Sequence, residues 1–207
     1  VDPCEQRRAL FAERYDRPAY ASLEMALREL SPDVVAIATP TQTHAEVLNE
    51  TLRHARPKVV LCEKPLAMNS RETAELVTLA KQSGLAAGVA YNIRFYPLCH
   101  EAAARVRDGG LGRVMHIGGS YVQDWLFYPT DYNWRVLAEE GGELRAIADI
   151  GTHWLDLIHH ITGLEVESLC AGLKTVHPVR QRPKGEVQTF RSKEKAAPLA
   201  TEAVNIK

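Results

Sequence analysis

Apolar and amphipathic segments alternate along the first half of the chain. Residues 3–15 and 22–30 have the apolar spacing of helices, and Ser22 is a candidate N-cap for the second. Residues 33–39 are apolar without alternation, which predicts a strand buried on both faces of a parallel sheet. Thr43 and Glu46 then form a candidate capping box, so we expect a helix that runs from there toward His54.

The same strand and helix order then repeats. Residues 58–62 predict a second strand, a helix capped by Ser70 and ended by Gly84 follows, and residues 85–91 return as a strand. Strands that alternate with helices are typical of a parallel sheet covered by helices. The pattern therefore predicts an α/β fold with a Rossmann-type, doubly wound parallel sheet.

The pattern changes after residue 93. We expect a helix over 96–107, a glycine-rich turn at 109–112, a strand over 114–122, a long aromatic loop, a helix from about 149 to Gly163 and a strand over 166–176. The polar tail from His177 has little to bury. We therefore predict two domains, residues 1–93 and residues 94–207.

Composition excludes several classes of protein. The 207 residues are 45% hydrophobic and 25% charged, with a formal net charge of -1, as in ordinary globular proteins. Neither a signal peptide pattern nor an apolar run of about 20 residues occurs, which disfavours a membrane role. Without a basic stripe, nucleic acid is a poor partner. The four cysteines are scattered, which disfavours structural zinc or a disulfide framework and fits a cytoplasmic location, although an export signal upstream would change that.

One expected motif of a dinucleotide-binding sheet does not occur. The sequence contains no G-x-G-x-x-G, the motif whose glycines let the backbone approach a pyrophosphate. An acidic residue after an apolar one ends the second strand of such domains, and the chain opens on Val1-Asp2, so we expect it to begin one βα unit late. The Asp2 carboxylate could accept hydrogen bonds from both ribose hydroxyls, which favours NAD over NADP; the alternative is a helix N-cap.

Candidate chemistry follows the next two strands. Ligands of open α/β sheets bind at the carboxyl ends of strands, where this chain has residues 39–44 and Glu63-Lys64-Pro65. The ammonium of Lys64 could donate to a substrate oxygen, or it could be a solvated loop lysine. The Lys64–Pro65 bond is a candidate cis peptide.

A second candidate group opens the helix near residue 150. Asp149 and His153 are four residues apart, so they share one helix face and could act on one substrate. The macrodipole near a helix N-terminus disfavours imidazolium, which leaves a neutral imidazole able to accept a proton. The alternatives are an ordinary cap for Asp149 and a structural hydrogen bond for His153.

An ordered set of short motifs extends over nearly the whole chain: T-P-x-x-x-H at 39–44, E-K-P at 63–65, Y-N-I-R-F at 91–95, W-R at 134–135 and D-I-G-T-H-W-L-D at 149–156. This set resembles the Gfo/Idh/MocA family, which includes glucose-fructose oxidoreductase and inositol dehydrogenase. The resemblance implies an NAD(P)-dependent oxidoreductase that transfers a hydride to or from a sugar, sugar-derivative or cyclitol hydroxyl or carbonyl. It further implies that residues 1–93 are an N-terminally incomplete Rossmann domain and residues 94–207 a C-terminally incomplete α/β domain with a large open, mainly antiparallel sheet. The substrate would lie between the two domains, and a homo-oligomer would be built on the second.

The resemblance also implies roles for single residues. Lys64 would be the central catalytic residue, His153 the general base and Asp149 the residue that binds or orients the substrate. The residues implied near the cofactor are Asp2, Arg7, Thr39, Pro40, Thr41, His44, Glu63, Lys64, Asn92, Trp134 and Arg135. Trp134 could instead be a packing residue. Residues 139–148, which precede Asp149, form a longer segment than the G-G-x-x-x-D motif of the family. This difference affects the expected substrate pocket and not the cofactor site.

Two other functions remain open. A protein of the same fold could bind the nucleotide as a sensor without turnover, and a truncated chain could be inactive. The presence of Lys64, Asp149 and His153 together favours the enzyme, because a sensor needs none of them for proton transfer. We expect the isolated chain to bind NAD poorly, whereas the full-length protein that contains it would bind NAD and turn over its substrate.

Overall fold

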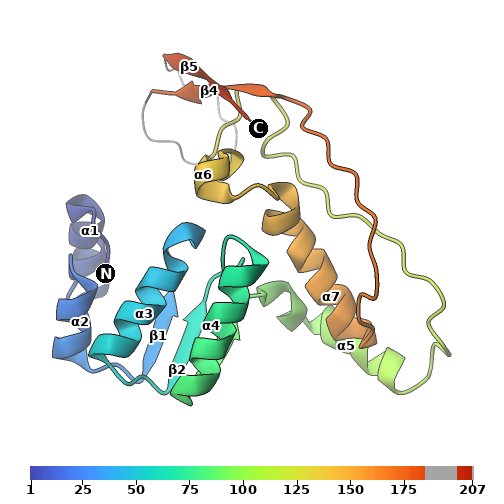
Figure 1. The fold of residues 1–207 in the computed structure, drawn as a ribbon, viewed down its shortest axis with the longest axis horizontal. Helices are drawn as coiled ribbons and strands as arrows, with labels where there is room; N and C mark the ends of the chain where they lie inside the picture. The colour runs from blue at the N-terminus through green and yellow to red at the C-terminus, as the bar shows by residue number, and fades with distance from the viewer. Residues whose placement is uncertain (185–199, 207) are drawn as a thin grey trace. The chain divides into compact units, whose positions relative to one another are not determined.

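The computed structural model describes residues 1–184 and 200–206, which form two compact units. The first unit comprises Val1–Ala90 and the second Tyr91–Lys207, so the division falls close to the boundary expected after residue 93. No helix of the described ranges is long and apolar enough to span a membrane. Figure 1 shows the helices and strands of both units.

The first unit is built on three parallel strands. Val34 of β1 pairs with Val59 of β2, which pairs with Ala86 of β3, so the strand order is β1-β2-β3. The sequential order and the helical crossovers confirm the predicted Rossmann-type sheet. The elements are α1 (Glu5–Tyr15), α2 (Leu23–Leu30), β1 (Val34–Ile37), the 3-10 turn η1 (Thr41–Thr43), α3 (His44–His54), β2 (Val59–Cys62), α4 (Ser70–Ser83) and β3 (Ala86–Val89).

Helices α3 and α4 cover one face of this sheet (Figure 1). Val60 and Cys62 of β2 point to that face and pack against Leu48 of α3 and Leu76 of α4. Leu61, between them, is 45% exposed because side chains of a strand alternate between faces. The expectation of strands buried on both faces is therefore not met within the described residues, where α3 and α4 cover one face of the Rossmann-type sheet.

The helix starts follow the sequence in part. Ser22 caps α2 as expected, since its side chain accepts a hydrogen bond from the Met25 amide. The next start differs, because the Thr43 hydroxyl donates to the Pro40 carbonyl instead of capping α3. Helix α4 is capped one residue earlier than expected, by Asn69, which accepts from the Glu72 amide. Gly84 ends α4 with φ 72°, a left-handed conformation that glycine adopts without steric cost.

Cys62 lies at the end of β2 in the core of this unit, and its reactivity can be tested. Burial, assisted by the charge of Glu63, raises the pKa of the Cys62 thiol to about 11. Since the thiolate is the reactive form, only roughly one molecule in a thousand is reactive at pH 8. We expect Cys62 to react at least about 100-fold more slowly than the exposed Cys170 with an aromatic disulfide reagent.

The measurement uses two variants that each keep one of these cysteines, with the others replaced by Ser. Absorbance of the released aromatic thiolate gives the two rates. In 6 M guanidinium the two rates should converge, because unfolding removes the burial. Equal rates in the native state would contradict the buried position of Cys62.

The second unit consists of helices, long extended segments and one hairpin. Its elements are the 3-10 turn η2 (Asn92–Phe95), α5 (Pro97–Arg107), the 3-10 turn η3 (Trp134–Val136), α6 (Ala138–Gly141), a π-helical turn η4 (Ile147–Gly151), α7 (Thr152–Thr162), and the antiparallel strands β4 (Val179–Pro183) and β5 (Thr201–Asn205).

The expected strands at 114–122 and 166–176 are not formed in this structure. Both segments are largely exposed; Val122 is 80% and Leu169 81% accessible. An apolar, extended segment becomes a strand only when a neighbour accepts its backbone hydrogen bonds. The antiparallel sheet of the described residues is therefore small, with two strands instead of the large open sheet expected.

The hairpin of β4 and β5 anchors the aromatic loop. Arg180 is 9% exposed, and its guanidinium donates to the carbonyl oxygens of Leu126, Tyr128 and Asp131, each at 2.9 Å. Beyond His177, where little burial was expected, Arg180 and Ile206 are buried and most other described residues are exposed or half-buried. Residues 185–199 lie outside the described residues.

Helices α5 and α7 pack together around two histidines. Asp156 of α7 forms an ion pair with Arg94 of η2, with its Oδ2 3.0 Å from Arg94 Nε. His160 lies on the same helix, and its ring meets the His100 ring edge-on at 5.5 Å. Burial, then the positive charges of Arg94 and His100, lower the pKa of His160, while Asp156 opposes them. The neutral imidazole is therefore the form that this packing favours.

This packing predicts a pH-dependent stability. The stabilisation by His160 is present above the unfolded pKa of about 6.5 and is lost as pH falls through the lower pKa of the folded state. Between pH 7.5 and 5 we expect the wild-type chain to lose more stability than His160→Gln, which cannot become charged. Urea unfolding midpoints at both pH values measure the difference. An identical pH dependence in the two proteins would contradict this assignment.

Candidate functional site

In the first unit, the candidate residues line the carboxyl ends of neighbouring strands. Strands β1 and β2 are parallel, and their pairing runs from Val34 with Val59 to Ile37 with Cys62. The loops that follow the two strands therefore leave the same edge of the sheet. Thr39 and Pro40 follow β1, and Glu63 and Lys64 follow β2. Thr39, Pro40 and Glu63 are exposed there, so this edge is accessible to a ligand.

His44 joins the two loops. Its ring is buried to 1% exposure, with Nε2 2.9 Å from the Thr39 carbonyl oxygen and Nδ1 3.1 Å from the Leu66 carbonyl oxygen. Both ring nitrogens are therefore directed at the backbone of this unit. This geometry makes His44 a positioning residue for the loops after β1 and β2, and its expected place near the cofactor stays a prediction.

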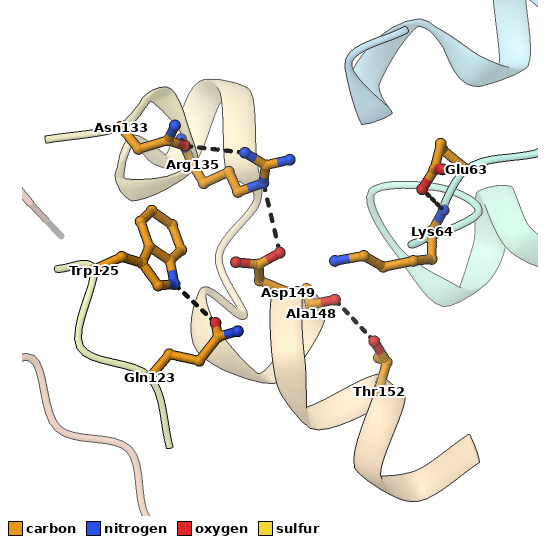
Figure 2. A network of polar contacts seen from close by, with 9 residues as sticks. All are labelled: Glu63, Lys64, Gln123, Trp125, Asn133, Arg135, Ala148, Asp149 and Thr152. Carbon is orange, nitrogen blue, oxygen red and sulfur yellow. Dashed lines mark hydrogen bonds and ion pairs between the residues drawn. The ribbon is translucent and has the colours of Figure 1, made fainter. Parts of the chain in front are cut away.

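Lys64 leaves the sheet directly after β2. Its backbone amide donates to Glu63 Oε2 at 3.2 Å, a contact drawn in Figure 2, so the Glu63 carboxylate shapes the start of this loop. The Lys64–Pro65 peptide bond is cis, as the sequence predicted. Thr41 is 8% exposed, so of the Thr39–Thr41 segment it is the least accessible residue.

Asp2 and Arg7 lie together at the start of α1. Asp2 Oδ1 accepts a hydrogen bond from the Cys4 amide at 2.8 Å, and Oδ2 lies 3.8 Å from Arg7 Nη1. The alternative of a local cap is thus realised in part, because one carboxylate oxygen satisfies an amide ahead of the helix. The ribose contact of Asp2 and the place of Arg7 near the cofactor stay predictions.

In the second unit, Arg135 is the centre of a polar network (Figure 2). Asn133, itself 4% exposed, accepts from both the amide and the guanidinium of Arg135 at 3.0 and 3.3 Å. The guanidinium Nε lies 3.5 Å from Asp149 Oδ1, and its carbon lies 4.4 Å above the Trp134 ring. These contacts hold Arg135 and Asp149 in one orientation. Trp134 serves here as a stacking surface for Arg135, which is the packing role considered from the sequence.

His153 lies in an aromatic pocket of the same unit. The residue is 8% exposed, and its ring packs against those of Tyr91 at 5.6 Å and Tyr121 at 6.3 Å. It belongs to the first turn of α7, which continues the π-helical turn that carries Asp149. The Thr152 hydroxyl bonds the Ala148 carbonyl across the junction at 2.9 Å (Figure 2). π-Helical turns occur often at functional sites.

Asn92 begins η2, the turn joined to α7 by the Arg94–Asp156 ion pair. It is exposed, so it remains accessible to a ligand. Sequence reasoning missed the residues that support the candidates: Tyr91 and Tyr121 beside His153, and Asn133 beside Arg135. Only Tyr91 carried a signal, as part of the Y-N-I-R-F motif, because supporting contacts depend on tertiary packing.

The first unit fits part of a nicotinamide dinucleotide. An exposed hydroxyl, a carboxylate and an ammonium follow adjacent parallel strands at Thr39, Glu63 and Lys64, which is where such cofactors bind in open α/β sheets. The glycine motif that receives the pyrophosphate is not among the 207 residues. The residues present therefore fit the nicotinamide half of the cofactor, which is the half that reacts.

Models of one protein family match both units. The oxidoreductase family with an NAD-binding Rossmann fold matches residues 1–91, and the GFO/IDH/MocA C-terminal domain matches residues 99–194. Levoglucosan dehydrogenase of Pseudarthrobacter phenanthrenivorans is 33% identical over 153 residues, which are 73% of this chain and 38% of the relative. Trans-1,2-dihydrobenzene-1,2-diol dehydrogenase of Sus scrofa is 29% identical, over 74% of this chain and 44% of the relative.

Solved structures agree with these matches. A levoglucosan dehydrogenase in complex with NADH and levoglucosan superposes with a TM-score of 0.80 at 28% identity, covering 86% of this chain and 48% of that one. An oxidoreductase domain protein from Kribbella flavida gives 0.81 at 29% identity, covering 98% and 51%. The chain spans about half the length of the proteins it matches or less. With both units matched by models of one family, the chain belongs to the Gfo/Idh/MocA family of oxidoreductases.

Proposed function

We propose that this protein is an NAD-dependent dehydrogenase that oxidises or forms a hydroxyl group of a sugar, sugar derivative or cyclitol. The observation that carries the proposal is the pair of loops at one edge of the parallel sheet, which presents Glu63 and Lys64 beside Thr39 and Pro40 and is held by His44. Two relatives are, by their names, dehydrogenases of levoglucosan and of trans-1,2-dihydrobenzene-1,2-diol. Both are compounds with neighbouring hydroxyl-bearing carbons.

Each candidate side chain has a chemical role in this reaction. A bound nicotinamide supplies the hydride acceptor or donor. The Lys64 ammonium donates a hydrogen bond to the reacting oxygen, which stabilises the negative charge that develops as its proton leaves. His153, close-packed by two tyrosines, accepts that proton in the direction of oxidation. Asp149, oriented by Arg135, accepts hydrogen bonds from substrate hydroxyls.

NAD is proposed over NADP because of Asp2. A carboxylate at the end of a strand accepts hydrogen bonds from ribose hydroxyls and repels a 2′-phosphate. One oxygen of Asp2 bonds the Cys4 amide, and the second lies toward Arg7, so the carboxylate retains acceptor capacity. Asp2→Ser should lower the ratio of kcat/KM for NAD to kcat/KM for NADP. Steady-state kinetics with both cofactors would measure this ratio.

The test is turnover by the protein as its gene encodes it. NADH absorbance is followed across a panel of inositols, aldoses, anhydrosugars and sugar acids, and calorimetry measures NAD binding to the same protein. Turnover of at least one hydroxyl compound supports the dehydrogenase. NAD binding without turnover across the panel would instead support a nucleotide sensor of the same fold.

A further inference from the structure

Arg145 has an unusual environment in the second unit. All three guanidinium nitrogens are buried, and none has a hydrogen-bond partner in residues 1–184 and 200–206. An arginine stays charged under all ordinary conditions, and a buried charge is costly unless it is paired. We therefore expect the guanidinium of Arg145 to have a hydrogen-bond acceptor when the protein functions.

The backbone of Arg145 is also in a disfavoured conformation. Its φ is 50°, in the left-handed region that side chains with a Cβ rarely adopt. Residues held in such conformations cluster at ligand-binding sites, where the surrounding structure maintains them. The strained backbone and the unpaired guanidinium are independent observations on one residue.

The position of Arg145 connects it with the proposed substrate residues. The Asp149 amide donates to the Arg145 carbonyl at 3.0 Å, so Arg145 lies one turn before Asp149 at the entry to the π-helical turn. Asp149, one turn away, lies 3.5 Å from Arg135 and makes no hydrogen bond to the Arg145 guanidinium.

We propose that Arg145 binds the carboxylate of the substrate, so that the preferred substrate is an acidic carbohydrate such as a uronate or an aldonate. A guanidinium forms two parallel hydrogen bonds with a carboxylate, which supplies both charge and orientation. This inference rests on the proposed function, because it takes Asp149 as a substrate residue. Since the guanidinium is enclosed, binding must shift residues that cover it, and amide hydrogen exchange in 142–149 should change when the acid binds.

The experiment compares matched acidic and neutral substrates in the protein as its gene encodes it. Glucuronate is paired with glucose and galacturonate with galactose, and glucose 6-phosphate reports on phosphate. The variants are Arg145→Met and Arg145→Lys, with Arg105→Met as a control because Arg105 is exposed and pairs with Glu101. We expect the acids to be preferred, and Arg145→Met to raise KM for the acid at least about 30-fold, with little change for the neutral sugar.

Thermal stability gives a second reading that needs no turnover. Without ligand, Arg145→Met should raise Tm because it removes a buried unpaired charge, and glucuronate should stabilise the wild type but not this variant. A lower Tm for Arg145→Met with unchanged KM for the acid would make Arg145 structural and overturn the inference. Preference for the phosphate over both acids would also overturn the carboxylate assignment.

The two proposals fail in different ways. Turnover of neutral sugars only, unaffected in Arg145→Met, would overturn this inference and leave the dehydrogenase standing. Glucuronate binding that needs Arg145, in a protein that turns over no compound of the panel, would support this inference and remove the dehydrogenase.

Discussion

Replacement of Lys64 by Met will lower kcat by about 100-fold to 10,000-fold, with NAD affinity changed only a few-fold. The physical reason is that, in the proposed reaction, the ammonium would interact most strongly with the substrate oxygen when that oxygen loses its proton. An interaction that strengthens in the transition state lowers kcat when it is removed, whereas uniform binding would change KM or cofactor affinity. Steady-state kinetics and calorimetry with NAD on the same preparations separate the two effects.

Lys58 provides a matched control for Lys64. It lies at the amino end of the same strand, its side chain is 78% exposed, and it pairs with Asp33 at 2.9 Å. Lys58→Met removes the same charge from the opposite edge of the sheet and should leave kcat unchanged. If Lys64→Met and Lys58→Met have the same activity, Lys64 takes no part in the reaction.

Replacement of His153 by Ala will reduce oxidation of the alcohol by a similar factor, about 100-fold to 10,000-fold, and added imidazole will restore part of the lost rate. The ring is 8% exposed and packed between Tyr91 and Tyr121, so its removal leaves a space shaped for imidazole. A free base in that space can accept the proton that His153 would accept. Rates measured against imidazole concentration should therefore saturate.

His159 tests whether this rescue is specific. It lies on the same helix, its side chain is 50% exposed, and it faces Glu165 at 3.4 Å. His159→Ala should retain wild-type activity and show no response to imidazole. If His153→Ala has a Tm close to that of the wild type and imidazole does not restore its activity, His153 is not the general base.

Most elements of the first unit could be predicted from the sequence. The apolar runs at 33–39 and 58–62 correspond to β1 and β2, and Gly84 ends α4 as expected. Such predictions succeed because strand and helix periods are local properties of the sequence. The residues at the carboxyl edge of the sheet could be predicted in the same way, because the carboxyl ends of parallel strands lie at one edge.

Helix caps were predicted less well because several side chains can compete for one amide. Thr43 has the sequence context of a capping box, but its hydroxyl bonds the Pro40 carbonyl in the preceding turn. At α4, Asn69 takes the position expected for Ser70, with a side chain that reaches the Glu72 amide. The competing partners are close in sequence, and the local backbone conformation decides among them.

The sequence by itself determined the element types of the first unit, the sequential parallel order and the residues at the strand ends, because these depend on periodicity and short connections. Only the tertiary structure decided that helices cover one face of the sheet and that segments 114–122 and 166–176 have no strand partners in the described residues. It also decided that His44 joins two loops, that Arg135 orients Asp149 and that Arg145 is buried without a partner in the described ranges. These contacts join residues whose burial and pairing depend on how distant segments pack, which no local pattern encodes.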